Sequence, residues 1–201
     1  MLAGCDGAGM ALFQPVTKSV QLAGGNVTIA GPAGYCVDRS ATRSNRDGGF
    51  ALLGSCASLA NDARVGAPSN AGALTASVSS ETGIDLAAST GVLGRFFASA
   101  AGRAALARNG DAASVQVLSS QRSQGVFMIR VRDTSPNRDS GLAQDYWRAV
   151  FDVRGRIVTL SVNAFQGRPM SNAVGRATLA EFVARVRREN PPLVDPTADP
   201  V

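Results

Sequence analysis

The side chains available for chemistry are limited, because histidine is absent from all 201 positions. Without it the chain lacks the usual general base near neutral pH and the commonest metal ligand. Its single lysine, Lys18, gives little support to Schiff-base chemistry, and the sequence has no phosphate-binding loop or GxSxG nucleophile motif. The sequence therefore lacks the residues of most familiar catalytic sites, although their absence does not exclude catalysis. We expect no cofactor and no metal.

Carboxylate pairs are the remaining candidates for hydrolysis. Two carboxylates such as Asp145 and Asp152 can in principle hydrolyse glycosides. Their odd spacing places them on opposite faces of a strand. An envelope hydrolase that uses carboxylate or serine chemistry is nevertheless the second hypothesis for function. It predicts a deep pocket holding a carboxylate with a raised pKa.

Three arginines lie on expected strands where their side chains could gather. Arg130 and Arg132 alternate with apolar residues, and Arg148 lies on the polar face of the following strand. Guanidinium groups bind carboxylates and phosphates through paired hydrogen bonds. We therefore predict a site for an anionic ligand at these three residues. The alternative is a solvated face whose charges are balanced by neighbouring aspartates.

The segment Leu2-Ala3-Gly4-Cys5 resembles the lipobox of bacterial lipoproteins. In that family the signal peptide is cut before the cysteine, which then carries acyl chains. The resemblance implies lipidation of Cys5 and attachment to a membrane, although the charged and apolar regions of a signal peptide are missing here. We expect residues 1–25 to form the lipobox and a flexible tether. The alternative is an ordinary cytosolic N-terminus.

If Cys5 is acylated, Cys36 and Cys56 are the two cysteines that remain. They can pair in the oxidising envelope that a lipoprotein occupies. A closed loop of about 20 residues contributes about 3 kcal/mol on the chain-entropy model. The main alternative is a pair of buried free thiols. No basic residue immediately flanks either thiol to activate it, so we predict a structural disulfide.

Basic residues exceed acidic ones by 20 to 15, which gives a net charge of +5. Such a charge suits an anionic lipid, an acidic partner or nucleic acid. A cytosolic nucleic-acid-binding protein is therefore the third hypothesis, and it requires Cys36 and Cys56 reduced and Cys5 unmodified. Few aromatic residues are available to stack bases, so we expect no nucleic acid.

The helices and strands that must position these residues are predicted to form one α+β domain over residues 26–190. Apolar spacing predicts a helix over about residues 90–109, and a Thr178–Glu181 capping box begins a second helix. Strands are expected over residues 26–30, 50–55, 74–79, 114–119, 125–132, 144–153 and 156–164, with loops over 38–49 and 61–72. Residues 191–201 form a Pro-rich tail that we expect to be disordered. The fold class is therefore an antiparallel β-sheet of about five to seven strands with two main helices packed on it, in two layers or as an α/β/α sandwich.

One strand pairing can be derived from the sequence alone. Arg154-Gly155 fits a two-residue hairpin turn. Pairing Val153 with Arg156 then places Trp147 opposite Val162 on a single apolar face. A shift of one residue would mix the apolar and polar faces, so we predict this register.

The order of elements is similar in outline to the PsbP-like fold. The features that resemble it are Gly31-Pro32-Ala33-Gly34-Tyr35, which follows an early strand, and the hairpin over residues 147–165. The resemblance implies a non-catalytic accessory protein that docks on a larger complex. No catalytic residue carries over from it.

The leading hypothesis is an exported bacterial protein, anchored by lipid to the periplasmic face of the cell envelope. We expect a non-catalytic binding or accessory module with a protein partner in the envelope. An anionic ligand is a further candidate for binding.

Overall fold

The computed structural model describes residues 15–82, 86, 90–136 and 141–192. The strands are β1 (Ser19–Leu22), β2 (Val27–Ala30), β3 (Tyr35–Ser44), β4 (Gly49–Ser55), β5 (Gly72–Glu81), β6 (Val115–Ser123), β7 (Val126–Asp133), β8 (Leu142–Val153) and β9 (Arg156–Phe165). The helices are α1 (Cys56–Ala60), α2 (Thr90–Ala98), α3 (Ala100–Leu106) and α4 (Asn172–Glu189), with 3-10 turns at Ala23–Gly25, Ala63–Val65 and Ala112–Ser114. Seven strands form one antiparallel sheet in the order β3-β4-β5-β9-β8-β7-β6, and β1 and β2 form a separate ribbon. The predicted α+β class is confirmed.

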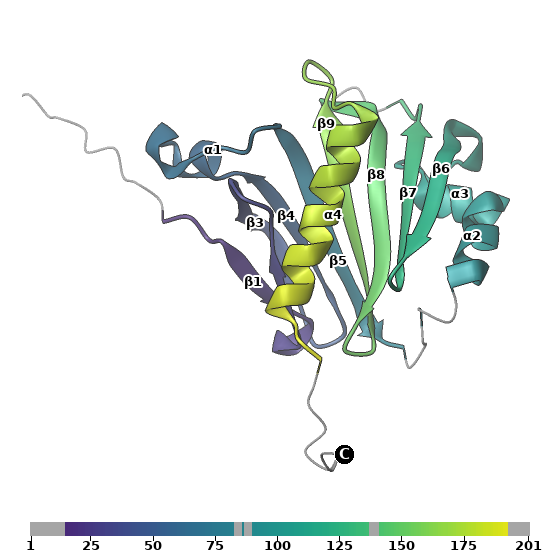
Figure 1. The fold of residues 1–201 in the computed structure, drawn as a ribbon, viewed down its shortest axis with the longest axis horizontal. Coiled ribbons are helices and arrows are strands. Elements are labelled where there is room, and N and C mark those ends of the chain that lie inside the picture. The colour runs from purple at the N-terminus through teal and green to yellow at the C-terminus, as the bar shows by residue number, and fades with distance from the viewer. Residues whose placement is uncertain (1–14, 83–85, 87–89, 137–140, 193–201) are drawn as a thin grey trace, which may run out of the picture.

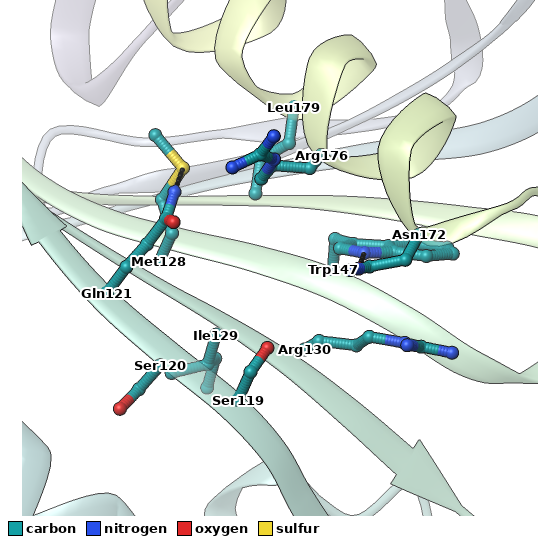
Figure 2. Close-up of a pocket in the computed structure, with 10 residues that line it drawn as sticks. All are labelled: Ser119, Ser120, Gln121, Met128, Ile129, Arg130, Trp147, Asn172, Arg176 and Leu179. Atoms are coloured by element: carbon teal, nitrogen blue, oxygen red, sulfur yellow. Dashed lines mark hydrogen bonds between the residues drawn. The ribbon is translucent and has the colours of Figure 1, made fainter.

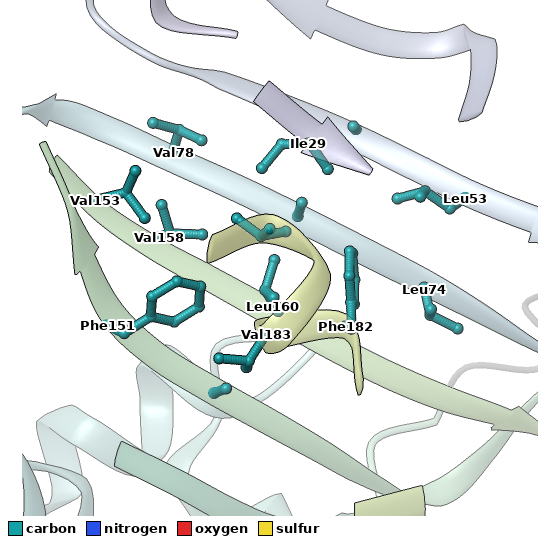
Figure 3. Packing of buried hydrophobic residues seen from close by; sticks show 14 of the residues in the cluster. Ile29, Leu53, Leu74, Val78, Phe151, Val153, Val158, Leu160, Phe182 and Val183 are labelled. Atoms are coloured by element: carbon teal, nitrogen blue, oxygen red, sulfur yellow. The ribbon is translucent and has the colours of Figure 1, made fainter. Parts of the chain in front are cut away.

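Helices cover both faces of this sheet (Figure 1). On one face α4 crosses β8 and β9, and Phe182 of α4 shares a hydrophobic core with Phe151 and Leu160 (Figure 3). On the other face α2 and α3 lie against β6 and β7, where Phe97 stacks on Phe127 with ring centroids 5.7 Å apart. The helices on the two faces therefore cover different strands, with α4 over β8 and β9 and the α2–α3 pair over β6 and β7.

The β8–β9 hairpin has the register predicted from the sequence. Trp147 pairs with Val162, and Val153 pairs with Arg156. Both turn residues, Arg154 and Gly155, have positive φ, at 54° and 74°. This is the backbone conformation that two-residue hairpins require, so the prediction is confirmed.

The loop predicted over residues 38–49 is wrong for most of its length. Strand β3 continues through this segment to Ser44 and pairs with β4, with an irregularity between Asp38 and Arg43. The Asp38 carboxylate accepts a hydrogen bond from the Ser40 amide at 2.9 Å within this irregularity. An edge strand has solvent on one side and can carry polar residues, which is why its composition resembles that of a loop.

The helix predicted over residues 90–109 is divided into α2 and α3. Ser99 separates them, and its hydroxyl caps α3 by accepting a hydrogen bond from the Gly102 amide at 3.1 Å. A Cβ at Gly102 would lie 1.9 Å from the Phe96 carbonyl oxygen. The close turn between the two helices therefore requires glycine at this position.

Helix α4 begins earlier than the sequence predicted. Its N-cap is Ser171, whose hydroxyl accepts a hydrogen bond from the Val174 amide at 3.2 Å. Thr178 lies inside the helix, and Glu181 accepts a hydrogen bond from the Ala33 amide at 3.3 Å. The predicted capping box is therefore wrong, and the additional N-terminal turns of α4 lie over Trp147.

Residues 19–25, which we expected within the tether, instead contribute β1 and a 3-10 turn. Leu22 and Ala23 have no exposed surface and Leu22 packs in the core under α4. Cys5 and the tail from residue 193 onward lie outside the described residues. Within the described segments, no helix has both the length and the apolar character needed to cross a membrane.

Candidate functional site

The structure brings two of the three predicted site arginines together and separates the third. Arg130 pairs with Trp147 across β7 and β8, and Arg132 pairs with Asp145, so both arginines are on the face that α4 crosses. Arg148 pairs with Ile129 and faces the opposite side of the sheet. The sequence established the β8–β9 register but not the β7–β8 register, and the latter decides which arginines share a face.

Arg130 and Arg132 share one carboxylate. Arg130 Nη2 lies 2.6 Å from Asp145 Oδ2, and Arg132 Nε lies 2.7 Å from Asp145 Oδ1. Burial by itself raises the pKa of Asp145, but the hydrogen bonds from Arg132 and Arg130 outweigh it and lower that pKa below its ordinary value. Two guanidinium groups beside one ionised carboxylate leave an excess positive charge next to Trp147.

Arg148 has a structural environment on the reverse face. Its guanidinium lies 5.1 Å from the ring centroid of Tyr146, and its Nε donates to the Ser161 hydroxyl at 3.1 Å. Arg108 stacks on the same ring at 5.5 Å. These cation–π contacts and the hydrogen bond account for Arg148 without a ligand.

A groove lies between α4 and the exposed side of β6 and β7. Its cavity volume is about 230 Å³. The floor comes from Met128 and Arg130 of β7 and from Ser119 and Gln121 of β6 (Figure 2). Trp147 of β8 and Arg176 and Leu179 of α4 form the walls. We call this cavity the α4 groove.

A β-bulge brings the two polar β6 side chains into the α4 groove. Val117 pairs with Val131, but Ser119 pairs with Arg130, so one extra residue is accommodated between them. The extra residue reverses the alternation of side chains along β6. Ser119 and Gln121 therefore share a face with Arg130 and Met128 rather than with the α2–α3 core.

Trp147 is the chain's single tryptophan and is held firmly at one end of the groove. Its indole Nε1 donates to Asn172 Oδ1 at 3.1 Å (Figure 2). Gly175 of α4 lies directly against the ring, since a Cβ there would be 2.4 Å from an indole carbon. The Arg130 guanidinium lies 5.6 Å from the ring centroid.

Arg176 is a groove residue that the sequence analysis missed. Asn172, Arg176 and Leu179 are spaced i, i+4 and i+7, which places them on one helix face. The predicted helix began at Thr178, so this spacing was not recognised. Arg176 forms no hydrogen bond or ion pair with any residue in the described segments.

The hydrolase hypothesis calls for a pocket carboxylate with a raised pKa. Each described aspartate whose pKa departs from the ordinary value has a lowered pKa instead, namely Asp38, Asp62, Asp133 and Asp145. Asp145 and Asp152 lie on opposite strand faces, as predicted. No metal-binding group of three or more histidine, cysteine, aspartate or glutamate residues occurs in the described ranges.

Cys36 and Cys56 form the predicted disulfide. It joins the start of β3 to the start of α1, and both cysteines are buried.

Neither a family model nor a curated protein matches this chain. The fold and the site define a disulfide-bonded α+β domain with a groove of about 230 Å³ beside its C-terminal helix.

Proposed function

We propose that this chain is a non-catalytic binding module held on the periplasmic face of the bacterial cell envelope by acyl chains on Cys5. The observation that carries this proposal is the Cys36–Cys56 disulfide. Disulfides persist in exported proteins and are rare in the reducing cytosol. The lipobox-like segment around Cys5 then supplies the means of attachment.

The charge around the first described residues supports attachment to an anionic membrane. Lys18 lines a cavity of about 380 Å³ together with Glu181, Arg185 and Arg188 of α4, and Arg185 also forms an ion pair with Glu189 at 2.9 Å. The chain enters the fold beside these cations, since β1 begins at Ser19. A basic side chain near an anionic leaflet adds about 1 kcal/mol of attraction, and the three cations less the carboxylates of Glu181 and Glu189 leave a net charge of +1 here. A lipid anchor joined to residue 15 would therefore be assisted by this surface.

The resemblance to PsbP-like domains adds an accessory role to the proposal. That resemblance implies a protein that docks on a larger complex and does not turn over a substrate. Co-purification after gentle extraction from the native membrane is the way to identify such a partner.

Expression in the native host tests the anchor and the compartment together. Mass spectrometry of the membrane fraction should find acylated Cys5, and a Cys5→Ser variant should leave that fraction. Thiol alkylation should label Cys36 and Cys56 only after reduction. An unmodified Cys5 with freely alkylated Cys36 and Cys56 would contradict the proposal and favour the cytosolic nucleic-acid-binding alternative.

A further inference from the structure

We propose that the α4 groove binds a small organic anion that carries an apolar group, with the charged end on Arg176. This inference rests on the proposed function as a binding module and names the class of ligand. Arg176, Met128, Leu179 and Trp147 surround one cavity together with the polar side chains of β6.

The charge of the groove favours an anion. Arg176 is exposed, and within the part of the chain that the structure describes it has no partner and no carboxylate lines the cavity. The nearest carboxylate described above, Asp145, is already shared by Arg130 and Arg132. Figure 2 shows the Arg176 guanidinium reaching from α4 toward Gln121 and Met128. A carboxylate in the groove would therefore meet an available guanidinium, with the Ser119 hydroxyl and the Gln121 amide also lining the cavity.

The rest of the groove favours an apolar group over a bare inorganic ion. Leu179 and Trp147 are 1% and 3% exposed, so their positions are fixed by the core beneath them. Met128 lies beside them and packs against the same core. Met128 is the apolar side chain of the groove that keeps appreciable exposed surface. An alkyl or aryl group placed here would cover its thioether and the small exposed edges of Leu179 and Trp147, and the removal of that surface from water favours binding.

The size of the groove limits the ligand. Its volume of about 230 Å³ is below the roughly 300–1,000 Å³ typical of pockets for drug-sized molecules. A short fatty acid or an aromatic acid fits this description better than a nucleotide or a protein segment does.

The position of the single tryptophan gives a direct measurement. Octanoate is the probe, octanamide is its uncharged analogue, and inorganic phosphate is the anion without an apolar group. We expect octanoate to change Trp147 fluorescence saturably and to release or absorb heat in calorimetry, whereas the other two should bind at least tenfold more weakly.

Two variants test the site and a third is the matched control. Arg176→Gln should weaken octanoate binding about 10- to 100-fold, because a charged hydrogen-bonding partner is lost. Ser119→Phe should abolish binding by filling the groove from β6 while keeping its charge. Arg95→Gln removes the same charge from an exposed position of α2, on the opposite face of the sheet from the groove, and should leave the affinity unchanged.

Four results would overturn the inference: no octanoate binding, equal binding of octanamide, equal binding of phosphate, or equal losses in Arg176→Gln and Arg95→Gln. None of these results bears on Cys5 acylation or on the redox state of Cys36 and Cys56. Failure here is therefore distinguishable from failure of the proposed function.

Discussion

Asp133, at the end of β7, is a carboxylate with no exposed surface and with hydrogen-bond donors on each side. Its oxygens accept from the amides of Arg108 and Ser135, both at 2.8 Å, and from the hydroxyls of Ser114 and Ser135. Burial alone raises the pKa of Asp133, but these hydrogen bonds outweigh it, and the pKa is lowered. The network joins the end of α3 to the strands it covers.

We expect Asp133→Asn to destabilise the protein by about 1–3 kcal/mol at neutral pH, because either orientation of the new amide places its NH2 group against a backbone N–H, that of Arg108 or that of Ser135. The Asp133 carboxyl of the wild type is ionised in both the folded and the unfolded state above its unfolded pKa of about 4. Its contribution is present above that pH and is lost as the pH falls through the lowered folded pKa. Urea denaturation between pH 2 and pH 7 should therefore show a weaker acid dependence in the variant.

The control for this measurement is Asp47→Asn, an exposed aspartate in the turn between β3 and β4. It removes the same charge without removing a buried acceptor. Equal losses of stability in the two variants would mean that the Asp133 network contributes nothing beyond net charge.

At the scale of an element, the contact between α4 and β8 depends on Gly175. Glycine weakens a helix interior by about 1 kcal/mol relative to alanine. Here it allows the helix backbone to lie on the indole of Trp147, where a Cβ would be 2.4 Å from the ring. The close approach also brings Asn172 to the indole Nε1 and fixes one end of the α4 groove.

Gly175→Ala should therefore destabilise the protein by about 1–3 kcal/mol through overpacking, despite the better helix propensity of alanine. A shift in Trp147 emission should accompany the loss. Gly94→Ala in α2 is the matched control, because its Cβ would meet Phe127 at an ordinary 3.8 Å. We expect that variant to be neutral or stabilised by up to about 1 kcal/mol. If chemical denaturation showed that Gly175→Ala raises the free energy of unfolding, α4 would be able to move away from the Trp147 ring without loss of stability.

At the scale of the whole molecule, the Cys36–Cys56 disulfide closes a loop with a sequence separation of 20. That loop contains the β3–β4 hairpin, which occupies one edge of the seven-stranded sheet. The disulfide therefore connects the edge of the sheet to α1 and lowers the conformational entropy of the unfolded chain.

We expect the double variant Cys36→Ala/Cys56→Ala to lose about 3 kcal/mol of stability on the chain-entropy model. Thermal and urea unfolding with and without reductant measure this loss. Reductant should destabilise the wild type and leave the variant unchanged. Cys5→Ser serves as the control for thiol chemistry and should unfold as the wild type does. If reductant left the wild type unaffected, the disulfide would not contribute to the stability of the fold.

The sequence by itself determined those features that depend on local patterns. Alternation of apolar residues around Arg154-Gly155 established the β8–β9 register, and the spacing of strands and helices predicted the α+β class. The sequence pattern predicted a loop in the second half of β3, because the polar residues of this edge strand have the composition of a loop. The pattern also failed where one close contact overrode periodicity, as at Gly102 between α2 and α3.

Only the tertiary structure decided which side chains share a site. Arg130, Arg132 and Arg148 were equivalent as polar strand residues, and the β7–β8 register then placed Arg148 on the other face. The bulge in β6 and the early start of α4 brought Ser119 and Arg176 to one groove. The register between two strands follows from packing across the sheet, whereas periodicity within one segment records only that segment's own two faces.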